Sequence, residues 1–349
     1  MLLRIYRREE LSNLEKERID WIDINKGVGI FMVLLGHLYI HDTVQENFIK
    51  TIIQSVHMPL FFFLSGYLMR IDRNMDLKDF FVKKAKSLLV PYSFFSVISF
   101  IYWLLKLKIQ NESVDISYML KCVFCLEGRC GYNDPLWFLL CLFFIEMAAF
   151  IFLNNKNRDI ISVLVISIVS GVGFSFIPRL LSFKIDSAIV MFPCFIFGYI
   201  ANKYQLVKKV KETPWIFFTL SITCLIIGNL NGMINIYGGN YRNIILTYIA
   251  SFTGVLSIST ISCKIRKNVI LEYMGRNSLL IMSTHFFVFD VFRLLGNHVL
   301  SISVMDIDGI LVNTVIAIIT VIVYIPVSMF VNKYLGFCVG KMGQNKAKI

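Results

Sequence analysis

Long apolar stretches separated by short polar segments recur along the chain from about residue 24 to residue 331. Each approaches the roughly 20 residues that a helix needs to cross the hydrocarbon core of a membrane. Backbone polar groups must be paired in that core, and no stretch shows the period of two of a membrane β-strand, so helices are predicted. The predicted spans are Ile24–Ile40, Ile53–Met69, Leu88–Leu107, Leu136–Leu153, Ile160–Ile177, Ile185–Ala201, Trp215–Leu230, Ile244–Ile261, Leu279–Leu295 and Ile310–Val331.

This pattern predicts an all-α, polytopic integral membrane protein with about ten transmembrane helices and one membrane domain over residues 1–349. Residues 1–20 are charged and lack the apolar core of a cleavable signal peptide. We therefore expect them to form a short amphipathic or solvated cytoplasmic helix that leads into the first span. Residues 333–349 are expected to be a cytoplasmic tail. The sequence shows no second domain, low-complexity linker or internal repeat.

The distribution of positive charge indicates the orientation. With the N-terminus in the cytoplasm, 25 of the 35 Lys and Arg residues fall on the cytoplasmic side and nine on the other, with Lys26 at the inner membrane edge. This bias follows the positive-inside rule and predicts that both termini are cytoplasmic. Most of the net charge of +12 is therefore a topology signal, and no nucleic-acid partner is expected.

Composition agrees with a membrane protein, because 56% of the residues are hydrophobic and 31 are Phe. Of the eight cysteines, Cys122, Cys125 and Cys130 cluster in the longest connection, which is expected to face outside. One CxxC pair without a second ligand pair is weak evidence for zinc, so no metal site is predicted. On the outer face two of the three cysteines would form a disulfide, or all three would stay reduced.

Two histidines stand in otherwise apolar spans, His37 in the first and His57 in the second. A titratable group in such a position is costly and usually marks a functional site, although a hydrogen-bonded packing histidine is the alternative. In two antiparallel helices both fall at a similar depth nearer the outer face, where they would face each other across a cavity. Asp23 and Lys26, three residues apart, share a helical face and are expected to pair with each other.

Six short motifs are spread over nearly the whole chain: DINKG at 23–27, GH at 36–37, HMPLFFFLSGY at 57–67, KKAKSLLVPY at 83–92, PLWFL at 135–139, and GRNSL at 275–279 with His285. In these motifs, and in their order, the sequence resembles the membrane acyltransferase 3 family.

This resemblance implies transfer of an acyl group, usually acetyl, from cytoplasmic acyl-CoA to a carbohydrate hydroxyl at or beyond the outer face. The acceptor would be a cell-surface or lipid-linked glycan, and acyl-CoA would be a co-substrate, with no bound cofactor. The chain resembles the branch of fucose 4-O-acetylase-like and intercellular-adhesion polysaccharide modification proteins. The implied location is the bacterial cell membrane, within the lipid bilayer, with a glycan-biosynthesis complex as a further partner.

The resemblance also suggests roles for individual residues. His37 matches the essential histidine of the family and would act as general base or as a transient acyl carrier, with His57 in support. Lys26 stands where many members have arginine. The donor phosphates would be held by Lys26 together with the basic run of Lys83, Lys84 and Lys86. The alternative for this run is a positive-inside anchor of the third span.

Five further residues are weaker candidates for supporting roles. Glu146 is an acid within the fourth span; it would have a functional role in the site or form a structural pair with a basic residue of the cavity. Trp137 would stack on a sugar or adenine, or anchor the helix at the membrane interface. Ser65 is more typical of helix packing than of a nucleophile. His285 would line the same cavity or pack in the core, and Asn277 belongs to the GRNSL motif.

A transporter of a polysaccharide or its lipid-linked unit is the competing function. Intramembrane His37, His57 and Glu146 suit a transport path equally well. The sequence shows no inverted-repeat pair of broken helices, which favours the enzyme. A sensory or binding domain would be expected to carry a soluble module, and none is visible.

Overall fold

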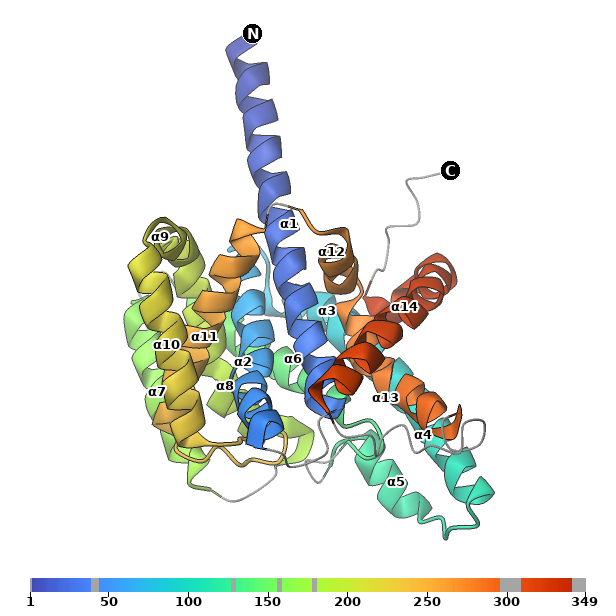
Figure 1. Ribbon diagram of the computed structural model, residues 1–349. Coiled ribbons are helices and arrows are strands. Elements are labelled where there is room, and N and C mark those ends of the chain that lie inside the picture. The colour runs from blue at the N-terminus through green and yellow to red at the C-terminus, as the bar shows by residue number, and fades with distance from the viewer. Residues whose placement is uncertain are drawn as a thin grey trace.

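The computed structural model describes residues 2–38, 44–126, 130–155, 159–177, 181–265, 267–295 and 309–340, with side chains from Asp20 onward. Within these ranges the regular elements are helices and no strand is present (Figure 1). The long apolar helices are α1 (Leu2–Leu38), α2 (Val44–Leu68), α4 (Val90–Ile109), α6 (Trp137–Leu153), α7 (Ile160–Ser175), α8 (Ile185–Lys203), α10 (Pro214–Asn231), α11 (Ile244–Lys264), α13 (Ser278–Leu295) and α14 (Ile310–Tyr334). The shorter elements are α3 (Leu77–Lys84), the π-helix η1 (Ala85–Leu89), α5 (Ile116–Val123), η2 (Asp134–Leu136), η3 (Ser182–Lys184), α9 (Leu206–Glu212), α12 (Val269–Arg276) and η5 (Gly336–Val339).

The predicted spans correspond one to one to these long helices, which confirms an all-α polytopic membrane protein. Among the described residues, nine helical segments are long and apolar enough to cross a membrane. The fifth predicted span corresponds to α7, which has only 16 residues. Tyr39 and Ile40, at the end of the first predicted span, and residues 341–349 of the predicted tail lie outside the described residues.

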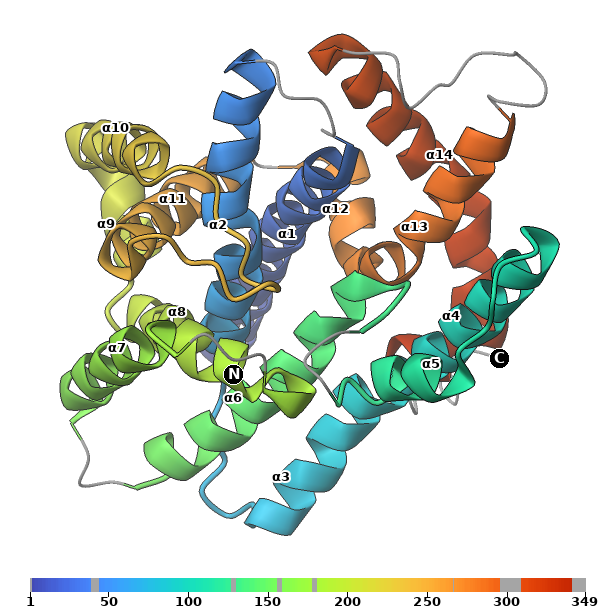
Figure 2. The same cartoon turned by 90° about the horizontal axis from the view of Figure 1, so that it is seen from below.

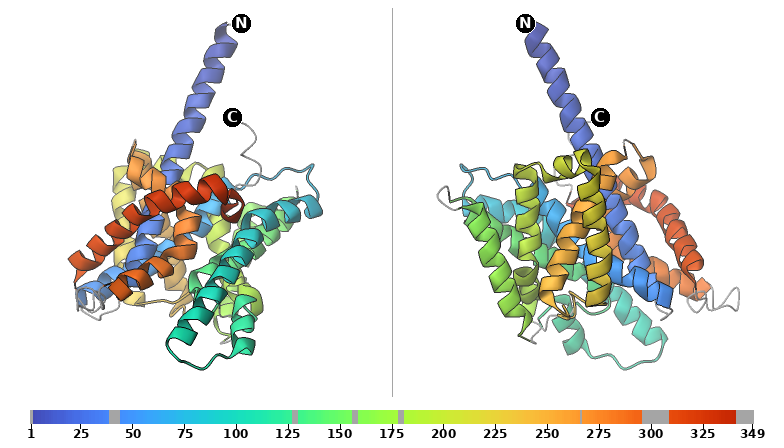
Figure 3. Two further views of the ribbon diagram at one scale, coloured as in Figure 1. Left: turned by 90° about the vertical axis from the view of Figure 1, so that its right-hand side faces the viewer. Right: turned by 60° about the vertical axis from the view of Figure 1, so that its left-hand side comes forward.

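Helix α1 runs without a break from Leu2 to Leu38, and its N-terminal half extends beyond the bundle (Figure 1). The end of α14 lies at this same end of the bundle (Figure 3). We call it the terminus end. The positive-inside pattern predicts that it faces the cytoplasm.

The pattern of long apolar stretches did not predict the short helices. Three of them, α3, α5 and α12, begin at side-chain caps: for example, Asp76 accepts a hydrogen bond from the amide of Asp79 at the start of α3, and Asn268 accepts one from the amide of Leu271 at the start of α12. Helix α3 continues through η1 into α4, giving one helical segment over Leu77–Ile109. A window of membrane-spanning length averages over such short elements, so it does not detect them.

Two pairs of glycines allow helices to approach at backbone contact. A Cβ at Gly27 would overlap the carbonyl oxygen of Leu271, and one at Gly275 would overlap that of Asp23, which locks α1 against α12. In the same way, Gly66 and Gly198 bring α2 against α8. The first contact places Lys26 of α1 and Arg276 of α12, each next to one of these glycines, on the same side of the bundle.

The connection between α10 and α11 folds back beneath the centre of the bundle, at the end opposite the termini (Figure 2). It is a hairpin in which Asn235 and Asn240 exchange two main-chain hydrogen bonds of 2.7 and 2.9 Å. Several of its residues reach the site described next.

Candidate active site

A cavity of about 410 Å³ lies toward the end of the bundle opposite the termini. It is lined by residues from four helices, η2 and the hairpin: Val33, Gly36, His37, Lys50, Gln54, His57, Met58, Asp134, Pro135, Trp137, Ile234, Asn235, Ile236, Tyr237 and Met282. We call it the histidine cavity. The structure thus brings His37 and His57 together, as the antiparallel spans predicted. His37 is exposed to this cavity, and Lys26, eleven residues earlier in the helix, lies about 16 Å away along the α1 axis.

A main-chain hydrogen bond sets the orientation of the His57 ring. Its Nδ1 lies 2.7 Å from the carbonyl oxygen of Ile53, one turn earlier in α2. A carbonyl only accepts hydrogen bonds, so this bond assigns the proton of a neutral ring to Nδ1. Nε2 then keeps its lone pair, which suits it to accept a proton or a hydrogen bond.

His285 is a third histidine at this site, fully buried on α13. Its Nδ1 donates to the carbonyl oxygens of Ile281 and Met282, at 3.1 and 2.9 Å. Its ring centroid is 5.0 Å from that of His37, and its Nε2 has no hydrogen-bond partner among the described residues. In the described part of the chain, no group of three or more His, Cys, Asp or Glu residues is arranged to hold a metal ion.

The hairpin forms one wall of the histidine cavity and is held by three contacts at Tyr237. The amide of Cys130 donates to its hydroxyl at 3.0 Å, and the fully buried Lys184 donates to its carbonyl oxygen at 2.6 Å. The Lys184 ammonium also lies 4.9 Å from the centroid of the tyrosine ring. Burial, followed by a hydrogen bond to Asp134, raises the pKa of Tyr237, so its hydroxyl stays protonated and can donate.

A second cavity, of about 510 Å³, lies toward the terminus end. It is lined by Asp23, Lys26, Phe61, Leu64, Ser65, Leu68, Leu88, Phe138, Leu139, Leu142, Gly275, Arg276, Ser278, Leu279 and Met282. We call it the basic cavity, after Lys26 and Arg276. Met282 also lines the histidine cavity, and it is the one residue that the two described linings share.

The ion pairs of the basic cavity differ from those expected. Asp23 was predicted to pair with Lys26, but its Oδ2 accepts a hydrogen bond of 3.1 Å from Arg276, which also donates to Glu272 at 3.1 Å. The glycine contact between α1 and α12 brings this guanidinium within reach of Asp23, which sequence spacing alone does not reveal. Lys26 forms no salt bridge with any described residue, although the carboxylate of Asp23, three residues earlier, is near enough to interact with its charge.

The lysine run that was predicted to bind the donor does not line the basic cavity. Lys84 instead donates to Glu146 at 2.9 Å, which confirms that Glu146 pairs with a basic residue. Both lie one turn from residues at the cavity wall, Leu88 and Leu142. Lys83 and Lys86 are exposed, and Lys86 lines a separate apolar groove with Phe81, Val90 and neighbouring residues. In a regular α-helix Lys83 and Lys86, three residues apart, would share one face, but the π-helix η1, with i→i+5 bonds, begins between them at Ala85 and alters this spacing.

The remaining supporting candidates fall in three places. Trp137 is buried in the histidine cavity, with its ring centroid 6.4 Å from that of Tyr237, so it is not an interfacial anchor. Ser65 lines the basic cavity and donates to the carbonyl oxygen of Phe61 at 2.9 Å. Asn277 lines neither cavity: it accepts a hydrogen bond from Asn332 and thereby ties the start of α13 to α14.

The cysteine cluster lies behind the hairpin wall. Cys125 and Cys130 are buried with their sulfur atoms 3.0 Å apart, and all eight cysteines are present as free thiols. Cys122 lies beside Gly131. The structure therefore singles out the pair that is placed to be oxidised, whereas the sequence left the pairing open.

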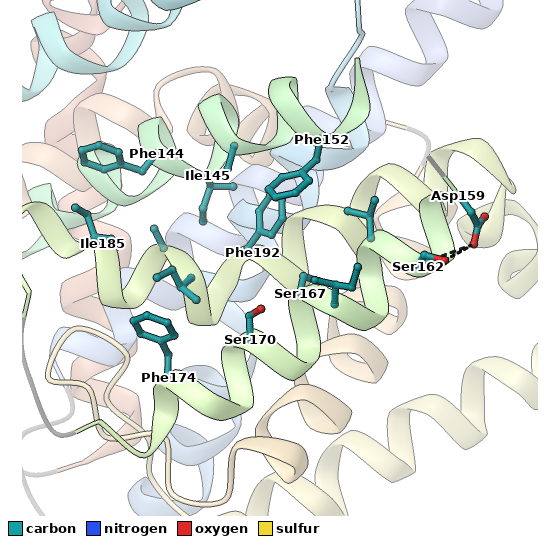
Figure 4. A pocket seen from close by; sticks show the side chains of 15 residues that line it. Phe144, Ile145, Phe152, Asp159, Ser162, Ser167, Ser170, Phe174, Ile185 and Phe192 are labelled. Carbon is teal, nitrogen blue, oxygen red and sulfur yellow. Dashed lines mark hydrogen bonds between the residues drawn. The ribbon is translucent and has the colours of Figure 1, made fainter. Parts of the chain in front are cut away.

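A larger cavity of about 750 Å³ lies between α6, α7 and α8 (Figure 4). Its walls are mostly apolar, with Phe144, Phe152, Phe174 and Phe192 pointing into it. The described residues that line it include no histidine, lysine or arginine, so it lacks groups for acyl transfer. Its size therefore does not make it the active site.

The sequence interpretation missed several residues of the two cavities. Arg276 was part of the GRNSL motif but was not selected for the site. Lys50, Gln54 and Tyr237 line the histidine cavity, and the Oε1 atom of Gln54 is buried without a hydrogen-bond partner among the described residues. No periodic pattern marks these positions, because the hairpin and the N-terminal half of α2 come together only in the folded chain.

Fold and site together define a polytopic membrane protein with a histidine-lined cavity toward one face and a basic cavity toward the other. A family model described as an acyltransferase domain matches residues 19–331. The chain therefore belongs to the acyltransferase 3 family and is a membrane acyltransferase. No curated protein and no solved structure matches it.

Proposed function

We propose that the protein transfers a short acyl group, acetyl above all, from acyl-CoA to a hydroxyl of a cell-surface or lipid-linked glycan. The observation that carries this proposal is the pair of cavities, basic toward the terminus end and histidine-lined toward the other, separated at Met282. With the terminus end in the cytoplasm, the donor enters from inside and the acceptor from outside. The setting is a bacterial cell membrane, where a glycan-biosynthesis complex would supply the acceptor.

Lys26 and Arg276 would hold the CoA phosphates by charge-assisted hydrogen bonds. Arg276 already pairs with Asp23 and Glu272, whereas Lys26 forms no ion pair among the described residues. Lys26 is therefore the cationic side chain of this cavity that is not held in a salt bridge to a described residue. The thioester end of the donor would extend along the apolar walls of the basic cavity toward Met282.

In the reaction, the acceptor hydroxyl attacks the thioester carbonyl, so a C–O bond forms and the C–S bond breaks. A neutral imidazole takes the proton from the hydroxyl and returns it to the leaving thiolate. His37 would be this base, because its ring is exposed to the cavity and flanked by His285. The alternative is a histidine that carries the acyl group transiently. The lone pair on Nε2 of His57 would orient the acceptor or the base.

The polar lining of the histidine cavity supports a carbohydrate as the acceptor. Gln54, Asp134 and Tyr237 offer acceptor and donor groups for hydroxyls, and Trp137 offers an aromatic face. A transport path for a polysaccharide would need a continuous opening, whereas the described residues enclose two separate cavities.

The test is to incubate the purified protein with radiolabelled acetyl-CoA and membranes that contain lipid-linked and surface glycans. We expect base-labile label in the glycan fraction, and ester groups missing from the surface glycans of a deletion strain. Unchanged glycan acylation in the deletion strain, together with no consumption of acetyl-CoA, would overturn the proposal and favour transport.

A further inference from the structure

Met282 occupies the boundary between the two cavities. It lies on α13 one turn after Ser278 and Leu279, which line the basic cavity, and one turn before His285, which contacts His37. Its side chain is buried, with 4% of its surface exposed. Its carbonyl oxygen accepts a hydrogen bond from His285, but this bond involves only the main chain of Met282. Side-chain changes at Met282 therefore leave that bond available.

The partition at Met282 is thin. On α2, Met58 lines the histidine cavity and Phe61, three residues later, lines the basic cavity. On α6 the change occurs between adjacent residues, Trp137 and Phe138. One helical turn rises about 5.4 Å, so the wall has roughly the thickness of one layer of side chains.

We propose that the Met282 side chain is the gate between donor and acceptor cavities and sets the length of acyl group that the enzyme transfers. This inference rests on the proposed function. The phosphates of CoA stay at the basic cavity, so only the uncharged thioester end has to pass Met282. Methionine is unbranched, with three rotatable bonds, and can move aside without backbone motion. We expect the opening that it leaves to admit a short, unbranched acyl group such as acetyl.

The test compares Met282→Ala, Met282→Leu and Met282→Trp with the wild type, using acetyl-, propionyl-, butyryl- and hexanoyl-CoA. Met282→Ala should raise the butyryl-to-acetyl ratio of kcat/KM by about tenfold or more, as expected for one or two methylenes in an apolar pocket. It should also increase acyl-CoA hydrolysis in the absence of acceptor. Met282→Trp should lower kcat for acetyl-CoA at least about tenfold while the dissociation constant of CoA stays unchanged.

Met274→Ala is the matched control, because Met274 is equally buried, on α12, but lines neither cavity. It should leave the order of acyl preference unchanged. Met282→Leu conserves volume and should fold and keep the wild-type preference, so the comparison with Met282→Trp stands even if the alanine variant is unstable.

The proposal that Met282 is a gate would be overturned if a folded Met282→Ala variant kept the wild-type butyryl-to-acetyl ratio of kcat/KM. It would also be overturned if Met282→Trp transferred acetyl at the wild-type rate. If instead the wild type itself used no acyl-CoA, the proposed function would fail and the gate with it. If the wild type transfers acetyl but the Met282 variants keep its acyl-chain preference, the proposed function stands and only the role of Met282 as a gate is rejected.

Discussion

The imidazole rings of His37 and His285 lie with their centroids 5.0 Å apart, although they come from α1 and α13. The two main-chain bonds at Nδ1 of His285 fix its tautomer and leave Nε2 as an acceptor beside the His37 ring. An N–H of His37 directed at this atom would present the other nitrogen of His37 to the cavity. We therefore expect His285 to position the base; the alternative that the sequence left open is that it only packs in the core.

The first prediction concerns His285→Asn. The amide of Asn can still donate to a main-chain carbonyl, but it has no acceptor at the position of Nε2. We expect kcat to fall about tenfold, with little change in KM for either substrate, because only the orientation of the base is affected. Steady-state kinetics of the purified variant, at matched thermal stability, provide the measurement. A wild-type kcat would mean that His285 only packs.

The second prediction ranks the two cavity-lining histidines. His37→Ala should abolish transfer, while His57→Ala should retain activity reduced by about two to three orders of magnitude, as for a supporting group. Both variants should insert and fold, because neither side chain belongs to the buried core. Initial rates in detergent decide the ranking. The reverse order would assign the base to His57.

The sequence was sufficient to predict the fold and the meeting of His37 with His57. Span length and charge bias depend on the membrane rather than on tertiary detail, so they can be read from the chain. The pairing of Asp23 was predicted wrongly because its partner Arg276 is distant in the sequence and is brought near by the contact of Gly27 with α12. The hairpin wall was missed for the same reason.

The third prediction concerns Lys184, which anchors the hairpin through the carbonyl oxygen of Tyr237. A hydrogen bond from a charged group contributes about 1.5–3 kcal/mol, so Lys184→Met should favour hairpin opening by at least about tenfold. Trypsin cleavage after the exposed Arg242 should then be faster by a similar factor. Lys208→Met, which changes an exposed lysine on α9, is the control and should leave the cleavage rate unchanged. Equal rates in both variants would show that Lys184 does not hold the hairpin.

The fourth prediction identifies the oxidisable thiols. A mild thiol oxidant should join Cys125 and Cys130, because their sulfurs are already 3.0 Å apart; two thiol protons and two electrons leave as one S–S bond forms. Peptide mapping after alkylation should show this link in the wild type and in Cys122→Ser, and should not show it in Cys130→Ser. A link through Cys122 would contradict the geometry.

The last prediction compares the basic cavity with the lysine run. Lys26→Gln should raise KM for acetyl-CoA about tenfold, with a smaller change in kcat, because it removes a cation that lines the proposed donor site. Lys86→Gln changes a residue of the lysine run that the sequence also assigned to donor binding, and it should have little effect, because Lys86 lines a separate groove. The effect of Lys26 should shrink as salt shortens the screening length below about 8–10 Å. Titration of acetyl-CoA at low and high salt separates the two variants. A larger increase in KM for Lys86→Gln than for Lys26→Gln would show that the lysine run, and not the basic cavity, binds the donor phosphates.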